Sequence, residues 1–341
     1  MTERVPLLLH SLADMRELWL PLLGAAGVRS VTEVGAETGV VTRLLAGWLG
    51  ERGGGRLVTV DPGAPGVPAD ELPSGVELDV VRDYSPEALR DLDGTDAWLL
   101  DGDHNYHVVT QELSEIERLH GGPEDLFPLV LMNDVAWPSG RRDQYYDPSR
   151  LPPEAVRPHT FAAGVRPGLA GVDTRGGFHG KGEFAVALEE GGPRNGVLTA
   201  VEEFLATRPH LELSVVTSVF GLGVVIDGRQ PWAAGVTGLI APFAASPFLE
   251  RLEANRVELY LRVLDLQDTV AAVERERIAV HARLAAVRSA ARSESLLAAI
   301  GAVQPPWPDG GDPDGADPAA PAVRTERGSH IAGSGGAALT A

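Results

Sequence analysis

The segment Val31–Gly39 constrains the fold more than any other part of this chain. It reads Val-Thr-Glu-Val-Gly-Ala-Glu-Thr-Gly, a short apolar strand that runs into a glycine turn. A second apolar strand, Arg56–Val60, follows a helical stretch and is closed by Asp61. Glycines in such a turn let the backbone approach a ligand, and a carboxylate roughly 20 residues further on can hold a ribose diol. The order of these elements therefore predicts a pocket for a nucleoside.

The spacing of the glycines indicates which nucleoside to expect. A dinucleotide fingerprint has the pattern G-x-G-x-x-G. Counted from Gly35, its second and third glycines are replaced by Glu37 and Val40, so a dinucleotide is not expected. The residues fit the pattern E-x-G-x-x-x-G instead, with Glu33, Gly35 and Gly39 at the marked positions.

Predicted strands and helices alternate along the first two thirds of the chain, which indicates a parallel sheet covered by helices on both faces. We expect strands near residues 30–34, 56–60, 76–81, 96–101, 128–133, 211–218 and 222–226, and helices near 11–26, 39–50, 85–91, 104–119 and 195–208. The last two strands are separated only by Val219–Gly221, a gap that suits a tight antiparallel hairpin. The sequence therefore predicts a doubly wound, Rossmann-like α/β sheet of seven strands with an antiparallel last strand.

Charge and composition exclude several classes of protein. The net charge of −19 argues against a nucleic-acid partner, which would need a basic face. The chain has no cysteine, so disulfides, thiolate metal sites and cysteine nucleophiles are excluded. No stretch approaches the roughly 20 apolar residues that span a bilayer, and the apolar run Val5–Leu9 is too short for a signal-peptide core. We therefore expect a cytoplasmic protein with no membrane partner.

A long irregular insertion, residues 136–194, separates the fifth predicted strand from the next helix. It is rich in proline, glycine, arginine and aromatic residues and contains the segment Arg141–Asp147. A loop of this length inside a compact domain is usually functional or disordered. Because it follows the carboxyl end of a strand, we expect a substrate lid that closes through Tyr145 and Tyr146. A surface excursion without a function is the alternative.

The segment 247–300 carries a heptad pattern. Apolar residues recur every seven positions, and a complementary seam, which Arg256 and Arg277 interrupt, lies four residues on; the two seams hold Leu252, Leu259, Leu266, Val273, Val280 and Val287, and Val263, Val270, Leu284 and Ala291. So narrow a stripe favours a partner helix, so we expect a coiled coil that makes a homo-oligomer through residues 252–291. A long helix folded back along its own domain is the alternative.

The chain is thus expected to have four parts. Residues 1–26 form a helical lead-in, and residues 27–232 form the nucleoside-binding domain, which includes the insertion. The coiled-coil helix spans 247–300. Residues 301–341 lack the apolar side chains to bury a core and are predicted to be disordered.

Two predicted strands end in polar side chains. Asp101 closes the fourth strand, and Asn133 and Asp134 follow the fifth. Because the carboxyl ends of strands in an open α/β sheet face one crevice, these groups are expected to meet there. His104 starts the adjacent helix, and an ordinary pKa of about 6.5 suits a base that accepts a hydroxyl proton. A structural role at the start of the helix is the alternative for His104.

These motifs resemble those of class I S-adenosylmethionine-dependent methyltransferases, over about residues 10–228. The resemblance implies S-adenosyl-L-methionine as the cofactor. It implies that Glu33 orients the glycine turn or contacts the methionine amine, that Asp61 holds the ribose, and that the segment around Tyr84 lies at the adenine. For Ser85 the alternative is a helix N-cap. The residues that the resemblance places at the cofactor are Glu33, Gly35, Glu37, Gly39, Asp61, Tyr84, Ser85 and Asp101.

The string Asp101–Tyr106, with Gly192–Gly196, is similar to a branch of natural-product O-methyltransferases that includes enzymes of macrolide sugars and relatives named cephalosporin hydroxylases.

The two strand ends also resemble catechol-type O-methyltransferases, in which an acid and an Asp-Asn pair hold Mg²⁺. The corresponding residues are Asp101, Asn133 and Asp134, the last two in reversed order. The resemblance thus implies a Mg²⁺ site. Alternatively no metal is present, Asp101 contacts the cofactor and Asp134 the substrate.

We therefore expect an S-adenosylmethionine-dependent O-methyltransferase that methylates a hydroxyl of a small molecule, such as a sugar or secondary metabolite, with His104 and Asp134 as catalytic residues. The alternative is a non-catalytic methyltransferase-like module for oligomerisation or recruitment, which the coiled coil and Glu37 motivate. Most members of the family have glycine at the position of Glu37. Oxidation at a two-His-one-carboxylate iron site is not expected, because His104 and His107 are the only histidines nearby.

Overall fold

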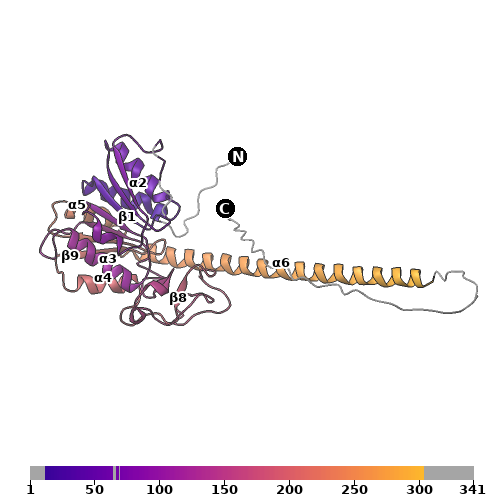
Figure 1. Cartoon of the computed structure of the whole chain (residues 1–341). Helices are drawn as coiled ribbons and strands as arrows, with labels where there is room; N and C mark the ends of the chain where they lie inside the picture. The colour runs from indigo at the N-terminus through magenta and orange to yellow at the C-terminus, as the bar shows by residue number, and fades with distance from the viewer. Residues whose placement is uncertain (1–11, 64–66, 69, 303–341) are drawn as a thin grey trace, which may run out of the picture. The chain divides into compact units, whose positions relative to one another are not determined.

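The computed structural model of the chain describes residues 12–63, 67–68 and 70–302 (Figure 1). The chain divides into two compact units, Met1–Glu276 and Arg277–Ala341, and each is described by itself. The tail predicted to be disordered lies outside the described residues beyond Ala302. No helix in the described ranges is both long enough and apolar enough to cross a membrane.

The first unit is built on a seven-stranded sheet (Figure 1). The strand order is β3-β2-β1-β4-β5-β10-β9. Neighbouring strands from β3 to β5 are parallel, whereas β10 is antiparallel to both β5 and β9. The strands are β1 (Ser30–Val34), β2 (Gly55–Val60), β3 (Val76–Val81), β4 (Ala97–Leu100), β5 (Leu129–Met132), β9 (Leu211–Val216) and β10 (Leu222–Asp227). The predicted α/β sheet with its antiparallel last strand is confirmed.

Two separate cores lie on the two faces of the sheet. In β4, Leu99 packs into one core and Trp98 into the other, and Leu131 and Val130 of β5 are divided in the same way. Central strands that are apolar on both faces must be covered twice. The first core contains residues of η1 (Leu12–Met15), α1 (Arg16–Ala25), α2 (Val40–Glu51) and α5 (Ala233–Ile240), and the second contains residues of η2 (Ala88–Asp91), α3 (Tyr106–Leu119) and α4 (Val197–Leu205).

Three local predictions differ from the structure. The helix predicted at residues 85–91 is only the short 3₁₀ helix η2, since the Ser85 hydroxyl donates to Glu112 instead of capping a helix. Helix α5 was not predicted. The insertion is not wholly irregular, because its short strands form an antiparallel sheet too brief to show a period in the sequence. Its elements are β6 (Gln144–Tyr145), η3 (Pro148–Arg150), η4 (Pro153–Ala155), β7 (His159–Thr160) and β8 (Ala185–Ala187), with strand order β6-β8-β7.

A buried arginine holds the insertion together. The side chain of Arg142 is only 1% exposed. Its guanidinium donates hydrogen bonds to the carbonyl oxygens of Ala187 at 2.6 Å, Ala170 at 2.7 Å, Gly171 at 3.1 Å and Leu169 at 3.2 Å. A buried cation is tolerated only where its donors find acceptors. Arg142 therefore ties two distant stretches of the insertion to one point.

The neighbouring Asp143 connects the insertion to two helices. Its carboxylate accepts hydrogen bonds from the backbone N–H of Tyr106 at 2.8 Å and of Gly196 at 2.7 Å, at the amino ends of α3 and α4. A negative charge is favourable at helix amino ends. Asp143 also accepts from the Tyr145 hydroxyl at 2.8 Å, and Tyr145 is fully buried. Tyr145 thus supports the insertion from inside, while Tyr146 is half exposed.

The last described helix, α6 (Pro247–Gly301), packs one face of its first turns on the first unit. Val257 and Leu261 are buried against Phe220 of the β9–β10 turn. Two aspartates further along α6 bind the insertion: Asp265 pairs with Arg166 at 2.7 Å and Asp268 with His179 at 3.0 Å. In the second unit, the side chains described between Arg277 and Gly301 are exposed. The coiled coil stays a prediction.

We expect the substitution Arg142→Leu to destabilise the first unit by about 3 kcal/mol, because it leaves buried carbonyl groups without donors. The measurement is chemical denaturation followed by circular dichroism. The control Arg141→Leu removes an arginine that is 42% exposed and pairs with Glu202. Its cost should stay below about 1 kcal/mol. Equal losses in the two variants would contradict the anchoring role of Arg142.

Candidate functional site

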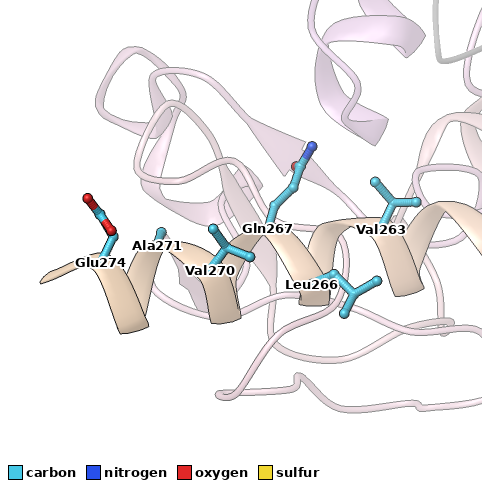
Figure 2. A pocket seen from close by; sticks show the side chains of 6 residues that line it. All are labelled: Val263, Leu266, Gln267, Val270, Ala271 and Glu274. Atoms are coloured by element: carbon cyan, nitrogen blue, oxygen red, sulfur yellow. The ribbon is translucent and has the colours of Figure 1, made fainter. Parts of the chain in front are cut away.

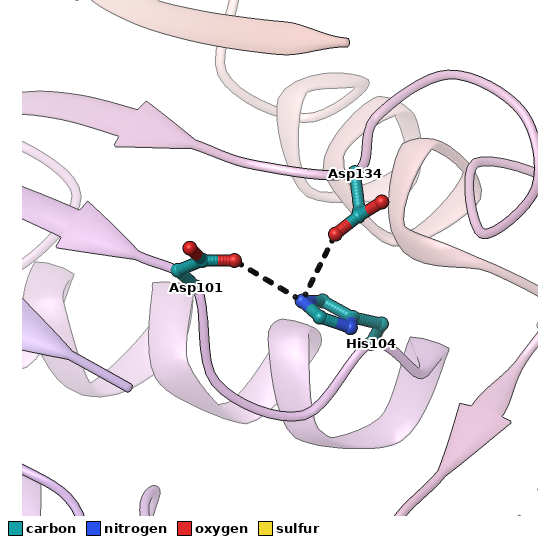
Figure 3. A group of neighbouring side chains, drawn as sticks. All are labelled: Asp101, His104 and Asp134. Carbon is teal, nitrogen blue, oxygen red and sulfur yellow. Dashed lines mark hydrogen bonds and ion pairs between the residues drawn. The ribbon is translucent and has the colours of Figure 1, made fainter. Parts of the chain in front are cut away.

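Three polar side chains converge beyond the carboxyl ends of β4 and β5 (Figure 3). Asp101 follows β4, His104 precedes α3, and Asp134 follows β5. The imidazole Nε2 of His104 lies 3.4 Å from Oδ1 of Asp101 and 3.3 Å from Oδ2 of Asp134. One ligand atom from each residue can be chosen so that all three lie within 4.8 Å of one another. The predicted meeting of these groups in one crevice is what the geometry shows.

Asn133 completes this cluster. Its side-chain amide donates to Oδ1 of Asp101 at 3.0 Å and to Oδ2 of Asp134 at 3.2 Å. Asn133 is 2% exposed, and Asp134 is 8% exposed. The Asn133 amide and the His104 imidazole thus contact the same two oxygens, Oδ1 of Asp101 and Oδ2 of Asp134. Such a set can hold either a proton or a hard cation between the carboxylates.

The charges of the cluster determine the protonation of His104. Burial alone would lower the pKa of His104, but the carboxylates of Asp134 and Asp101 outweigh it and raise the pKa to about 9. At neutral pH the imidazole is therefore protonated. The base role predicted for His104 needs the neutral imidazole. A positive charge bound beside the two carboxylates would offset their effect and favour that neutral form.

The backbone of Asp134 is itself strained. Its φ is +58°, in the left-handed region that non-glycine residues seldom occupy. Such conformations cost on the order of 1 kcal/mol or more and are concentrated at functional sites. Here the strain directs the Asp134 carboxylate toward Asp101 and His104.

The insertion contributes Tyr146 to the crevice. Its ring centroid lies 6.2 Å from that of His104 and 6.1 Å from that of Phe184. Partial burial, together with the charges of Asp101 and Asp134, raises the pKa of the Tyr146 phenol, which therefore stays protonated. Tyr146 is thus the residue of the predicted Tyr145–Tyr146 lid that faces the site.

The glycine turn packs against the strand that carries Asp101. A Cβ atom on Gly35 would lie 2.1 Å from the carbonyl oxygen of Asp101, and the φ of Gly35 is +85°. Glycine is therefore required at position 35 because the turn lies close to the backbone of Asp101. Gly39 caps α2 at φ +74°. Glu37, exposed between them, adopts φ +46°, a conformation that glycine would adopt more easily.

Asp61 binds the glycine turn. One carboxylate oxygen accepts the backbone N–H groups of Ala36 at 2.9 Å and Glu37 at 3.1 Å, and the other accepts that of Gly63 at 2.6 Å. Asp61 therefore lies next to the turn, as predicted from its spacing, and holds the shape of the turn. A ribose diol would share a carboxylate that already accepts three hydrogen bonds.

Glu33 lies beneath the turn, where it is only 1% exposed. One carboxylate oxygen accepts hydrogen bonds from the Thr42 hydroxyl at 2.6 Å and the Thr59 hydroxyl at 3.2 Å. Burial raises the pKa of Glu33 to about 7, although the two hydroxyl groups oppose the shift. Because these bonds join β1, β2 and α2, the arrangement fits the first of the two predicted roles, orienting the turn.

The predicted adenine segment has two different faces. Tyr84 is 39% exposed, and the guanidinium of Arg150, from the insertion, lies 3.5 Å from its ring centroid. Ser85 points inward and donates a hydrogen bond to Glu112 on α3. Burial raises the pKa of Glu112 to about 8. The helix N-cap alternative for Ser85 is wrong, because its hydroxyl is a donor to Glu112.

Several residues of the crevice were not found from the sequence. Asp103 lies within the string Asp101–Tyr106 but was given no role there, and burial raises its pKa to about 6. Glu112 belongs to a helix in which no motif was found. Arg150 lies in the insertion, whose path no pattern predicts. Of the histidines in the insertion, His179 pairs with α6, and Nδ1 of His159 donates to the backbone carbonyl oxygen of Arg157 at 2.9 Å. Neither belongs to the cluster around His104.

Comparison with known proteins found fold neighbours only. No protein-family model and no curated protein matches the sequence. The crystal structure of a proposed caffeoyl-CoA O-methyltransferase from Staphylococcus aureus is 12% identical with a TM-score of 0.34, and the match covers 66% of this chain and 86% of that one. That of a proposed O-methyltransferase from Klebsiella pneumoniae is 14% identical with a TM-score of 0.34, covering 66% and 82%.

We expect the substitution Glu33→Gln to reveal the raised pKa of Glu33 as a pH dependence of stability. A carboxyl whose folded pKa of about 7 exceeds its ordinary 4.5 binds its proton more tightly when folded. Wild-type stability should therefore fall as pH rises from 4.5 to 7, by on the order of 3 kcal/mol from this residue. The glutamine side chain does not titrate, so the stability of this variant lacks the pH dependence that Glu33 causes. The stability difference, variant minus wild type, should increase over that range in urea titrations, and a pH-independent difference would refute the shift.

Proposed function

We propose that this chain is an S-adenosylmethionine-dependent O-methyltransferase that methylates a hydroxyl group of a small molecule. The observation that carries the proposal is the cluster of Asp101, His104 and Asp134 next to the glycine turn. Acid-base groups there lie beside the place where the turn would hold a nucleoside. Methyl transfer from a sulfonium needs little else from a protein than alignment of the acceptor, removal of its proton and exclusion of water.

The charge of the crevice supports a cationic cofactor. Glu37, Asp61, Asp101 and Asp134 surround it, and an acidic cleft concentrates cations. When bound, S-adenosylmethionine would supply a methyl group on a positively charged sulfur. Asp61 and the turn would hold the nucleoside, while Tyr146 and Phe184 would cover the crevice and exclude water.

Removal of the acceptor proton would fall to His104 or Asp134. A neutral His104 accepts a proton at Nε2, the atom that faces both carboxylates. Asp134, already directed into the crevice, accepts a hydrogen bond from an incoming hydroxyl and fixes its orientation. The two residues therefore act on the same proton.

We also propose that the cluster holds a divalent cation. The donor chemistry fits, since the carboxylate oxygens of Asp101 and Asp134 lie close together, and the carbonyl oxygen of Asn133 would join them once its amide, whose N–H groups now face the carboxylates, turns over. Such oxygen ligands suit Mg²⁺ and Mn²⁺. Such a cation would offset the carboxylate charges and lower the pKa of a hydroxyl bound beside it. Asp101, Asn133 and Asp134 are the residues that would hold it, with His104 next to them.

Binding of S-adenosylhomocysteine tests the cofactor. In calorimetry the full-length protein should bind it, and Asp61→Ala should raise the dissociation constant at least about tenfold, because the turn loses the acceptor that shapes it. The control Asp79→Ala removes an exposed carboxylate that pairs with Arg56 on the sheet edge. It should leave the affinity unchanged. A wild-type protein that binds no S-adenosylhomocysteine would end the enzyme proposal and favour the non-catalytic module.

Binding of Mn²⁺ tests the cation. Titration followed by electron paramagnetic resonance should detect one tight site in the wild-type protein. The substitution Asp134→Asn should weaken that site at least about tenfold, since it removes a charged ligand. Asp79→Asn is again the control. If Asp134→Asn binds Mn²⁺ as tightly as the wild-type protein, the cluster is a proton site and not a metal site.

A further inference from the structure

Helix α6 presents two different faces within the first unit. Val257 is 4% and Leu261 1% exposed where the helix packs on Phe220. Leu266 and Val270, by contrast, are 64% and 66% exposed. Successive residues of a helix turn by about 100°, so this exposed pair points nearly opposite to the packed pair. The fold of the first unit therefore uses one face of α6 and leaves the other to solvent.

The exposed face is a shallow apolar groove along a single helix (Figure 2). Its lining residues are Val263, Leu266, Gln267, Val270, Ala271 and Glu274. The three large apolar side chains among them belong to the predicted heptad seams. Within residues 12–63, 67–68 and 70–276, no element of the first unit covers them. An apolar stripe of this kind on a helix is normally covered by another helix.

We propose that a second copy of this chain covers the groove, and that the two α6 helices pair antiparallel about a two-fold axis near residue 268. In this register Val263 lies opposite Val273 of the other copy, and Leu266 lies opposite Val270. The surface is self-complementary because each stripe supplies both members of every pair, as a two-fold interface requires.

Charges beside the groove favour this register. In an antiparallel pair, residues at the same flanking heptad position face each other. Arg262 and Glu276 both directly precede a residue of the same seam, so Arg262 faces Glu276 of the other copy, and the two-fold axis repeats this pair. A shift by one heptad in either direction loses this match: it places Arg262 against Arg283, or Glu253 against Glu274. Opposite charges at such positions set partner choice and orientation.

Charges within the seam argue against a parallel pair. Of the two arginines that interrupt one seam, Arg256 is turned onto its own chain, where it pairs with Glu253 at 2.6 Å and lies over the ring of Phe220. Arg277 is exposed, and a parallel pair would bring it against its own copy. Like charges at such core positions are destabilising. In the antiparallel register Arg277 instead faces Leu259 of the other copy, and its long apolar stem can cover that leucine while the guanidinium reaches solvent.

Engineered cysteines distinguish the two orientations, and the chain has no cysteine of its own to interfere. We expect Val263→Cys alone and Val273→Cys alone to stay uncrosslinked on oxidation of the full chain. An equimolar mixture of the two variants, one of them tagged, should give the mixed disulfide dimer. Efficient self-crosslinking of either single variant would show a parallel pair and overturn the orientation.

Lysines in the groove test the interface itself. Sedimentation should show a wild-type dimer at micromolar concentration. The variant Leu266→Lys with Val270→Lys should raise the dissociation constant at least about 100-fold, because it replaces the four apolar side chains at the centre of the dimer with lysines that face each other. The matched control, Ala272→Lys with Ala279→Lys, puts two lysines on exposed positions off the stripe and should stay dimeric. Circular dichroism shows that the variants fold.

Charge reversal tests the register. Arg262→Glu should weaken the dimer about 3- to 10-fold, and adding Glu276→Arg should restore it. A wild-type chain that sediments as a monomer, or as a trimer or larger species, would overturn the proposal. So would groove lysines that leave the dimer as stable as the control.

Discussion

The contact between the glycine turn and the end of β4 positions the rest of the candidate site. Gly35 lies so close to the carbonyl oxygen of Asp101 that a side chain there would overlap it. Hydrogen bonds continue this alignment across the sheet, from the Asp101 N–H to Val34 at 2.8 Å and from the Asn133 N–H to Leu100 at 2.9 Å. Three strand ends are thereby held level, so side chains that are up to about 100 residues apart in the chain face one crevice. The glycine turn and the cluster therefore form one structural unit, which depends on all three strand ends.

Much of this construction could be read from the sequence, because it depends on local patterns. Apolar runs of strand length, closed by glycine or aspartate, predicted the sheet, and the short gap at Val219–Gly221 predicted its antiparallel end. Side-chain partners over long distances could not be read in this way. Nothing in the sequence shows that Asp61 binds turn amides, or that Ser85 donates to Glu112 instead of capping a helix. The insertion was the least predictable part, since its order depends on buried hydrogen bonds of Arg142 and Asp143 and not on periodicity.

The cluster is held in a balance between repulsion and attraction. Two carboxylates repel each other at this distance unless a positive group lies between them, and in the protein alone the protonated His104 is that group. The same charges that bring the residues together thus oppose release of the proton that catalysis would require. Strain at Asp134 and at Glu37 adds a conformational cost to the same region. The negative charges fit the proposed binding of a cationic cofactor, which would offset them.

The anchoring of the insertion bears on how ligands would exchange. Arg142 and Asp143 secure it from inside, and Asp265 and Asp268 of α6 secure it from outside. A segment held at so many points has little conformational entropy left to lose when a ligand arrives. In the proposed function it would therefore form a preformed wall of the crevice, and entry of ligands would depend on side-chain rotations at its rim. Movement of that kind takes place in picoseconds to nanoseconds for exposed residues, far faster than the opening of a whole loop.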